Sequence, residues 1–308
     1  DPQGWMSSWM LTIRTAFGPG CTLSEGRDRS AASEFRQKVR SGEHSWHTSG
    51  EVGNHVQANM VALPKEQAFD FLVFCLRNPR SCPLLDVLEA GTTAPLSVAP
   101  QANITTDIPR YRVYKDGVAE GLDGPDERKD IRDVWRGDMV GFLLGCSFTW
   151  EAALCQEGLT PRHIEEGCNV PMYRTRIPNA PSGVFRGHLV VSMRPYDPSK
   201  VDRVTQITSL YPGAHGGPLH VGDADSLFER FGIERERVGR PDFGDPVTVR
   251  EGEVLMLWAC GVTPQTAIAE ARLPLAVTHS PGCMFVTDLL VDEIREGGGR
   301  YSKDRTTT

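Results

Sequence analysis

The sequence lacks any Cys-x-x-Cys pair, although it contains eight cysteines. This absence argues against a zinc ribbon or a dithiol redox motif, and 308 residues can form a core without disulfide bonds. Several cysteines stand in apolar runs, where a free thiol packs as a small hydrophobic side chain. We therefore expect reduced thiols and an intracellular protein. The cysteines are residues 21, 75, 82, 146, 155, 168, 260 and 283.

Long apolar runs and basic clusters are missing as well. The longest apolar stretches, MVGFLLGC and VLMLWACGV, match a core strand in length and are too short to cross a bilayer. The net charge is −7, and no stretch is typical of a nucleic-acid surface. We expect no membrane partner and no nucleic-acid partner. Self-association as a homodimer is left open.

Strand and helix patterns alternate along the chain, which predicts an α/β fold. Helices are expected at residues 30–42, 63–79, 126–135, 149–158, 198–212 and 263–274. Strands are expected at residues 56–63, 111–117, 138–148, 185–196, 251–261 and, as a pair, 276–293. Residues 83–91 predict a short helix or turn, 167–183 a loop, and 218–223 a short strand.

The Pro- and Gly-spaced middle of the chain predicts a second, smaller unit. We expect residues 31–146 and 213–296 to form the main α/β unit and residues 147–212 to form an inserted α+β unit. Residues 1–30 and 297–308 are expected to be loose. The first of these is poor in acidic residues, so the remnant of a transit segment is the alternative.

Two segments share one layout, an apolar strand followed by a cysteine, a threonine and a helix. They read FLLGCSFTWEAAL and LMLWACGVTPQTAIAEA. Helix N-termini present free N–H groups and a partial positive charge, which suits a carboxylate ligand. The alternative is that the two threonines only cap their helices. The candidate residues of these segments are Ser147, Thr149, Glu151, Cys260, Thr263 and Gln265.

Three further segments carry polar groups near Pro and Gly corners. Asn169, Tyr173 and Arg174 are predicted to bind substrate, with Arg174 or Arg176 as a bidentate carboxylate clamp; ordinary surface arginines are the alternative. His279 ends a strand before Pro-Gly and Asp288 ends the next strand. His279 therefore fits an acid–base role, or a histidine satisfied by a backbone carbonyl.

The stretch YPGAHGGPLHVGD places His215 and His220 on either side of a Gly-Gly-Pro corner. A zinc-binding histidine pair of the His-Glu-x-x-His type needs a helix, which this corner excludes. We predict that His215 is an acid–base residue and that His220 supports it. A metal held with distant ligands, such as Asp223 or His279, stays an alternative.

Six blocks, in order over about residues 38–290, resemble the D-glutamate cyclase family. They are HVQANMVALPKEQAFDFLVFCLRNPRSCPLLDV, GFLLGCSFTWEAAL, CNVPMYRT, GPLHVGD, WACGVTPQTAI and VTHSPGCMFVTD. The resemblance implies a three-layer α/β/α unit interrupted by a smaller two-layer α+β unit. It also implies reversible conversion of D-glutamate into 5-oxo-D-proline and water, in the cytoplasm of bacteria or in mitochondria of eukaryotes.

Set against this reaction, the residues offer a set of roles. His215 or His279 would be base or acid, Glu151 the partner carboxyl, and Arg174 the clamp. Cys260 would be a reactive thiolate or a buried structural thiol. No cofactor is expected, with a divalent metal as the alternative. The competing functions are a non-catalytic binder of a small carboxylate and a metal-dependent enzyme that opens a lactam.

Overall fold

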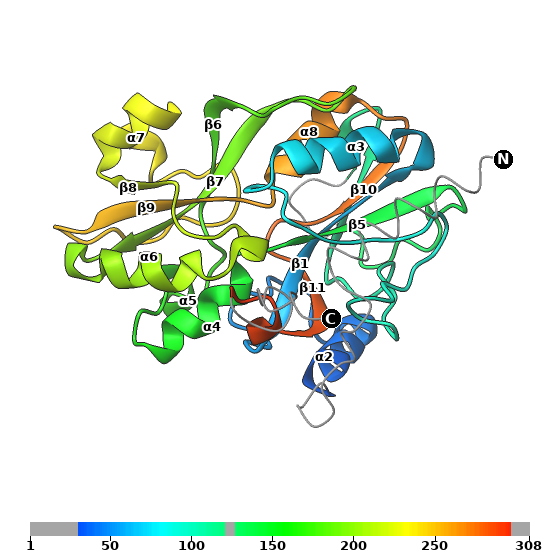
Figure 1. The fold of residues 1–308 in the computed structure, drawn as a ribbon, viewed down its shortest axis with the longest axis horizontal. Coiled ribbons are helices and arrows are strands. Elements are labelled where there is room, and N and C mark those ends of the chain that lie inside the picture. The colour runs from blue at the N-terminus through cyan, green and yellow to red at the C-terminus, as the bar shows by residue number, and fades with distance from the viewer. Residues whose placement is uncertain (1–29, 121–126, 297–308) are drawn as a thin grey trace, which may run out of the picture.

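The computed structural model describes residues 30–120 and 127–296. Two antiparallel sheets lie next to each other, with helices packed around them (Figure 1). The first sheet has the order β2-β5-β1-β10-β3-β4, and β11 also pairs with β1. The second sheet has the order β6-β7-β9-β8. This mixture of helices and sheets confirms the α/β prediction, although all the strand pairings of the described residues are antiparallel.

The strands of the first sheet are β1 (His55–Pro64), β2 (Leu84–Val87), β3 (Tyr111–Lys115), β4 (Val118–Ala119), β5 (Met139–Gly145), β10 (Ala276–His279) and β11 (Phe285–Leu290). Those of the second are β6 (Met172–Pro178), β7 (His188–Tyr196), β8 (His220–Gly222) and β9 (Val254–Ala259). The helices are α2 (Ser30–Ser41), α3 (Lys65–Arg77), α4 (Phe148–Gln156), α5 (Arg162–Glu165), α6 (Val201–Ser209), α7 (Ala224–Phe231) and α8 (Thr263–Ala271). Short 3-10 turns cover Pro198–Lys200, Pro212–Ala214, Arg235–Arg237 and Val291–Glu293.

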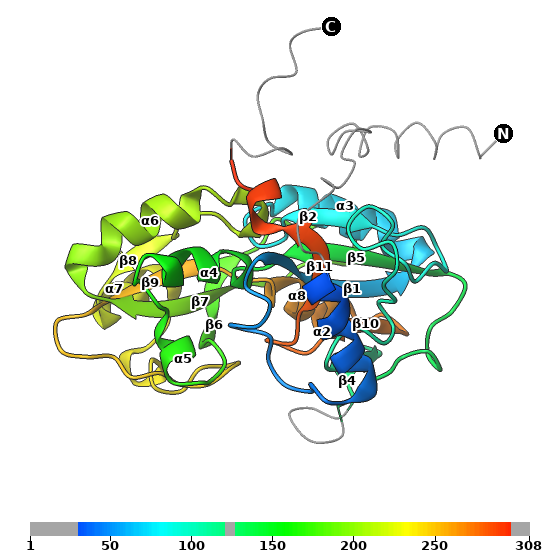
Figure 2. The same ribbon diagram turned by 90° about the horizontal axis from the view of Figure 1, so that it is seen from below.

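Strand β1 is the centre of the first sheet. All ten of its residues are buried, because β5 pairs along one edge and β10 and β11 share the other. Its first half nevertheless alternates polar His55, Gln57 and Asn59 with apolar residues. These polar side chains can be buried because they bond within the protein, as Gln57 does with the Thr48 carbonyl over 3.0 Å. Helices α3 and α6 lie on one side of the strands and α5 on the other (Figure 2). None of the helices in the described ranges is long and apolar enough to span a membrane.

Most expected elements are confirmed, and three are wrong. Residues 84–87 form strand β2 because they pair with β5, and residues 172–178 form strand β6 because they pair with β7. No helix occupies residues 127–135, the described part of the expected polar helix. That segment packs Ile131 into the core through turns, and its charged side chains pair locally, as Arg128 does with Asp133.

The second sheet extends beyond the range predicted for the smaller unit. Strands β8 and β9 follow the expected boundary at residue 212, yet β9 pairs with β7 and β8 pairs with β9. The chain therefore passes between the two sheets more than once. How it divides into domains stays a prediction. Of the predicted extensions, residues 1–29 and 297–308 lie outside the described residues, while Ser30 begins α2.

Candidate active site

The two segments with the shared layout anchor themselves in the same way. After β5, the Cys146 N–H donates to the carbonyl of Gln57 on β1 over 3.1 Å. Thr149 Oγ1 then accepts from the Gln57 N–H over 3.1 Å and lies 3.3 Å from the Gln57 carbonyl, to which it donates. A single residue of the neighbouring strand thus holds both the cysteine and the threonine.

The second segment repeats this arrangement in the second sheet. The Cys260 N–H donates to the carbonyl of Val190 on β7 over 3.0 Å. Thr263 Oγ1 accepts from the Val190 N–H over 3.0 Å and donates to the Val190 carbonyl over 3.3 Å. Neither threonine caps its helix, so the capping alternative is wrong. Both instead join a helix to the strand beside it.

The helices that follow cross to the opposite sheet. Helix α4 continues from the first sheet, yet its Trp150 lies 5.4 Å from Trp258 of β9, measured between ring centroids. Helix α8 continues from the second sheet, yet Gln265 donates to the carbonyl of His279 on β10 over 3.0 Å. Figure 1 shows α4 beside the second sheet and α8 beside the first. The two segments therefore meet at the junction between the sheets.

Glu151, two residues after Thr149, is the centre of a buried polar network. Its Oε1 accepts from Arg194 and from His163 over 2.8 Å each, and its Oε2 accepts from Ser49 over 2.8 Å. Burial acts to raise the pKa of Glu151, but His163 and Arg194 outweigh burial and lower it to about 2. Burial lowers the pKa of His163 while Glu151 opposes it. We therefore assign the ion pair to Glu151 and Arg194, and a neutral imidazole to His163.

Arg194 of β7 is fully buried against the segment that carries Ser147 and Glu151. Its guanidinium carbon lies 4.6 Å from the ring centroid of Trp150 and 5.4 Å from that of Trp258. Its Nη1 donates to Ser192 and its Nη2 to Ser147, both over 3.1 Å. Its Nε has no hydrogen-bond partner among the described residues. Such a cation, flanked by aromatic rings and keeping one unused donor, can bind a carboxylate.

Sequence reasoning missed Arg194, His163 and Ser49. The one available signal was the arginine inside the apolar strand HLVVSMRPY, because a charge within a buried strand needs a partner. His163 and Ser49 carry no such signal, since they lie in segments that are irregular or of a single turn. They reach Glu151 only through the tertiary fold. Ser147, which was predicted, does join the network through Arg194.

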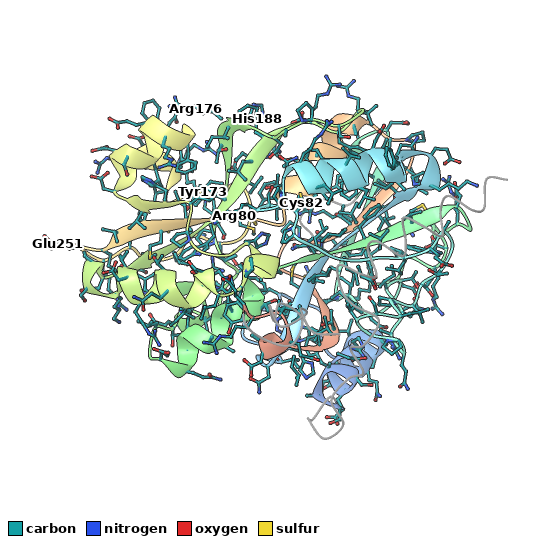
Figure 3. All side chains as sticks on the ribbon, in the orientation of Figure 1. Arg80, Cys82, Tyr173, Arg176, His188 and Glu251 are labelled. Carbon is teal, nitrogen blue, oxygen red and sulfur yellow. The ribbon has the colours of Figure 1, made fainter. Side chains whose placement is uncertain are left out.

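His215 lies at the corner where sequence reasoning placed an acid–base residue. Its backbone is left-handed, with φ of 75°, and its Nδ1–H donates to the carbonyl of Arg80 over 2.7 Å. Arg80 lies near the middle of the molecule, between the elements of the two sheets (Figure 3). Burial lowers the pKa of His215 to about 4, so the ring is neutral at pH 7. Its Nε2 then presents a lone pair. His220, in contrast, bonds Ser226 and contacts the edge of Phe231.

His279 is held by both ring nitrogens. Nδ1 lies 3.1 Å from the backbone of Met60, and Nε2 accepts from Gln265 over 3.2 Å. Burial lowers its pKa to about 4. These contacts tie β10 to β1 and α8, which matches the alternative of a histidine satisfied by a backbone carbonyl.

The remaining predicted substrate-binding residues have other partners. Arg174 is exposed, and its guanidinium carbon lies 5.1 Å from the ring centroid of Phe243. The Tyr173 hydroxyl donates to the carbonyl of Val238 over 2.6 Å, and Asn169 donates to that of Pro281 over 3.1 Å. Arg176 lies toward α7, away from the junction (Figure 3). Asp288 forms an ion pair of 2.7 Å with Arg36 of α2.

The described ranges contain no group of three or more His, Cys, Asp or Glu side chains that is arranged to hold a metal ion. A cavity of about 600 Å³ lies elsewhere on the molecule. It is lined by Val39, Arg40, Ser41, Gly42, Gln101, Asn103, Thr106, Lys129, Asp130 and Arg132. None of these residues belongs to the two crossing segments, residues 142–154 and 255–271, which hold half of the predicted site residues.

Comparison with known proteins decides the family. The sequence model of the family described as D-glutamate cyclase matches residues 140–288, which include both crossing segments and none of the residues lining the cavity. A Geobacillus kaustophilus protein named "Putative hydro-lyase GK2103" is 50% identical over 264 residues, covering 86% of this chain and 96% of that protein. The chain belongs to the D-glutamate cyclase family.

A Rubrobacter xylanophilus member named "Putative hydro-lyase" is 52% identical over 257 residues, covering 83% of this chain and 95% of that protein. The D-glutamate cyclase family and these names agree on the hydro-lyase class. Among solved structures, the nitrogen repressor-like protein MJ0159 of Methanococcus jannaschii aligns at 8% identity with a TM-score of 0.30, over 82% of this chain and 96% of that one. A score this low carries no argument.

Proposed function

We propose that this member of the D-glutamate cyclase family converts D-glutamate reversibly into 5-oxo-D-proline and water. The observation that carries the proposal is the buried Glu151–Arg194 ion pair, which lies beside the junction where α4 and α8 begin. A substrate with two carboxylates suits such a place, since each helix N-terminus has a partial positive charge and free N–H groups. Arg194 adds a buried cation with an unused donor.

In this proposal the α-carboxylate binds at the start of α8 and the γ-carboxylate at the start of α4. Arg194 and Ser147 then lie beside the γ-carboxylate and stabilise the tetrahedral oxyanion. Glu151 is a positioning residue, because it holds Arg194 through a hydrogen-bonded ion pair. Arg194 thereby takes the clamp role that the sequence suggested for Arg174. Holding both ends of the substrate supplies much of the rate, since ring closure is intramolecular.

The protons of the reaction balance within the substrate. The ammonium loses two protons, its nitrogen bonds to the γ-carbon, and one γ-carboxylate oxygen leaves with both protons as water. His215 Nε2 is the proposed carrier, because its Nδ1–H is fixed by the Arg80 carbonyl. A His215 whose pKa is low when unliganded becomes a strong acid once protonated, which suits donation to a departing hydroxyl.

The test is turnover of D-glutamate, measured as loss of primary amine and as 5-oxo-D-proline separated by chiral chromatography. The proposal expects product from the D-isomer, loss of turnover in Arg194→Met, and unchanged turnover in Arg174→Met. Saturable calorimetric binding without product would favour the non-catalytic binder instead. Turnover that a chelator abolishes and added metal restores would favour the metal-dependent alternative.

A further inference from the structure

We propose that Cys146 and Cys260 are an acid–base pair that exchanges the α-proton of the bound amino acid or its lactam on opposite faces. This gives the protein a stereoinversion activity beside cyclisation. The inference rests on the proposed function for its substrate class, a small 2-amino carboxylate. Its evidence lies in how the two crossing segments present their thiols.

The two cysteines occupy equivalent positions in the repeated layout. Each follows the last residue of a central strand, each donates its N–H to the neighbouring strand, and each precedes a helix of nine residues. The repeat continues beyond them, since Glu151 and Gln265 stand five residues after their cysteines and both bond to histidines. The chain has therefore built the same thiol-bearing turn twice.

The two turns also lie against each other. Asn59 on β1 donates to the carbonyl of Gly145, next to Cys146, over 2.8 Å. The same Asn59 amide packs so closely against Gly261, next to Cys260, that a Cβ on this glycine would collide with it. Both cysteines belong to one buried cluster of otherwise apolar residues. In this proposal the amino acid binds between the two turns, with one thiol on each face of its α-carbon.

Two features around each thiol favour its thiolate against the effect of burial. Each sulfur accepts from the N–H two residues later, that of Phe148 or Val262, at the start of a helix. The positive charge of Arg194 acts on both sulfurs, and its buried Nε has no partner within the described ranges. Burial raises the pKa of both thiols, that of Cys260 to about 11 and that of Cys146 further. Cys260 therefore forms its thiolate more easily and starts as the base, while Cys146 keeps its proton and starts as the acid.

The step balances without an oxidant or a cofactor. The Cys260 thiolate removes the α-hydrogen as a proton, and the C–H electron pair moves into the adjoining carboxylate as an enolate. The Cys146 thiol then gives its proton to the opposite face of the α-carbon. The product has inverted configuration, Cys260 ends as a thiol, and Cys146 ends as a thiolate. The reverse turnover, or proton exchange with water, restores the first state.

The experiment incubates the full chain with 5-oxo-D-proline or D-glutamate in D₂O and follows α-deuteration by proton NMR and inversion by chiral chromatography. The wild type is expected to incorporate deuterium and to form the L-isomer. Cys146→Ser and Cys260→Ser should each lower inversion about a hundredfold or more, the scale of losing a general acid or base. Each variant should still exchange the α-hydrogen of the isomer whose C–H bond faces the remaining thiol, without changing the configuration of that isomer.

Cys155→Ser is the matched control, because Cys155 lies on α4 outside the buried thiol cluster. It should leave exchange and inversion unchanged, and thermal melts should show all three variants folded. If a serine variant fails to fold, the corresponding Cys→Ala variant replaces it. A wild type that cyclises D-glutamate without α-deuteration overturns the thiol pair and leaves the proposed function intact. A wild type that shows neither cyclisation nor α-deuteration would overturn both the thiol pair and the proposed function.

Discussion

Replacing Glu151 by Gln should destabilise the protein in a way that depends on pH. The substitution keeps the shape of the side chain but leaves the buried Arg194 cation without its counterion. The pKa of Glu151 falls from the ordinary 4.5 to about 2 on folding. At about 1.4 kcal/mol per unit of pKa, this corresponds to about 3 kcal/mol at pH 6. Breaking a buried pair by removing one partner costs about 3–5 kcal/mol, which agrees.

The sign follows from the direction of the pKa change. Because the folded pKa is the lower one, the stabilisation is complete above the unfolded pKa and is lost as pH falls toward the folded pKa. The difference in unfolding free energy between wild type and Glu151→Gln should therefore shrink from about 3 kcal/mol at pH 6 to about 1 kcal/mol at pH 3. Subtracting the variant removes the titration of His215 and His279, which have no bond to Glu151, whereas the titration of His163 changes with its partner.

Urea unfolding followed by tryptophan fluorescence measures this difference, since Trp150 and Trp258 are buried beside the network. Glu157→Gln is the control, because Glu157 pairs with Arg203 at the exposed end of the same helix; it should change nothing measurable. Adding Arg194→Met to Glu151→Gln should recover part of the loss. Equal stability of wild type and Glu151→Gln at pH 6, or a difference that grows toward pH 3, would refute the reasoning.

Three further outcomes are expected. His215→Asn should lower turnover about a hundredfold with an unchanged thermal melt, whereas His220→Asn should have little effect; the reverse order would exchange their roles. Arg194→Lys should raise KM for D-glutamate at least about tenfold, because an ammonium lacks the planar fork, and Arg174→Lys should not. Thr149→Val should lower the free energy of urea unfolding by about 1–3 kcal/mol, since it leaves buried backbone groups of β1 without their partner; an unchanged value would show that this tie is dispensable.

The sequence alone determined the family, the α/β class and most elements. Alternation of apolar strands with capped or proline-led helices is a local property, so β1, α3, β5 and α8 appear where periodicity placed them. It could not identify β2, because a short half-polar segment becomes a strand only when a neighbour offers its edge. It did not determine strand direction either, because direction depends on how the chain returns to each sheet.

Only the tertiary structure decided the composition of the site. The repeated turns were visible in the sequence, but not that each helix crosses to the other sheet and so brings Glu151 to Arg194. The charge of Arg194 was visible, yet its burial and its partners were not. The reason is that burial and pairing depend on contacts between residues far apart in the chain. Local patterns report propensity, whereas the charge state of a buried group is set by whatever the fold places against it.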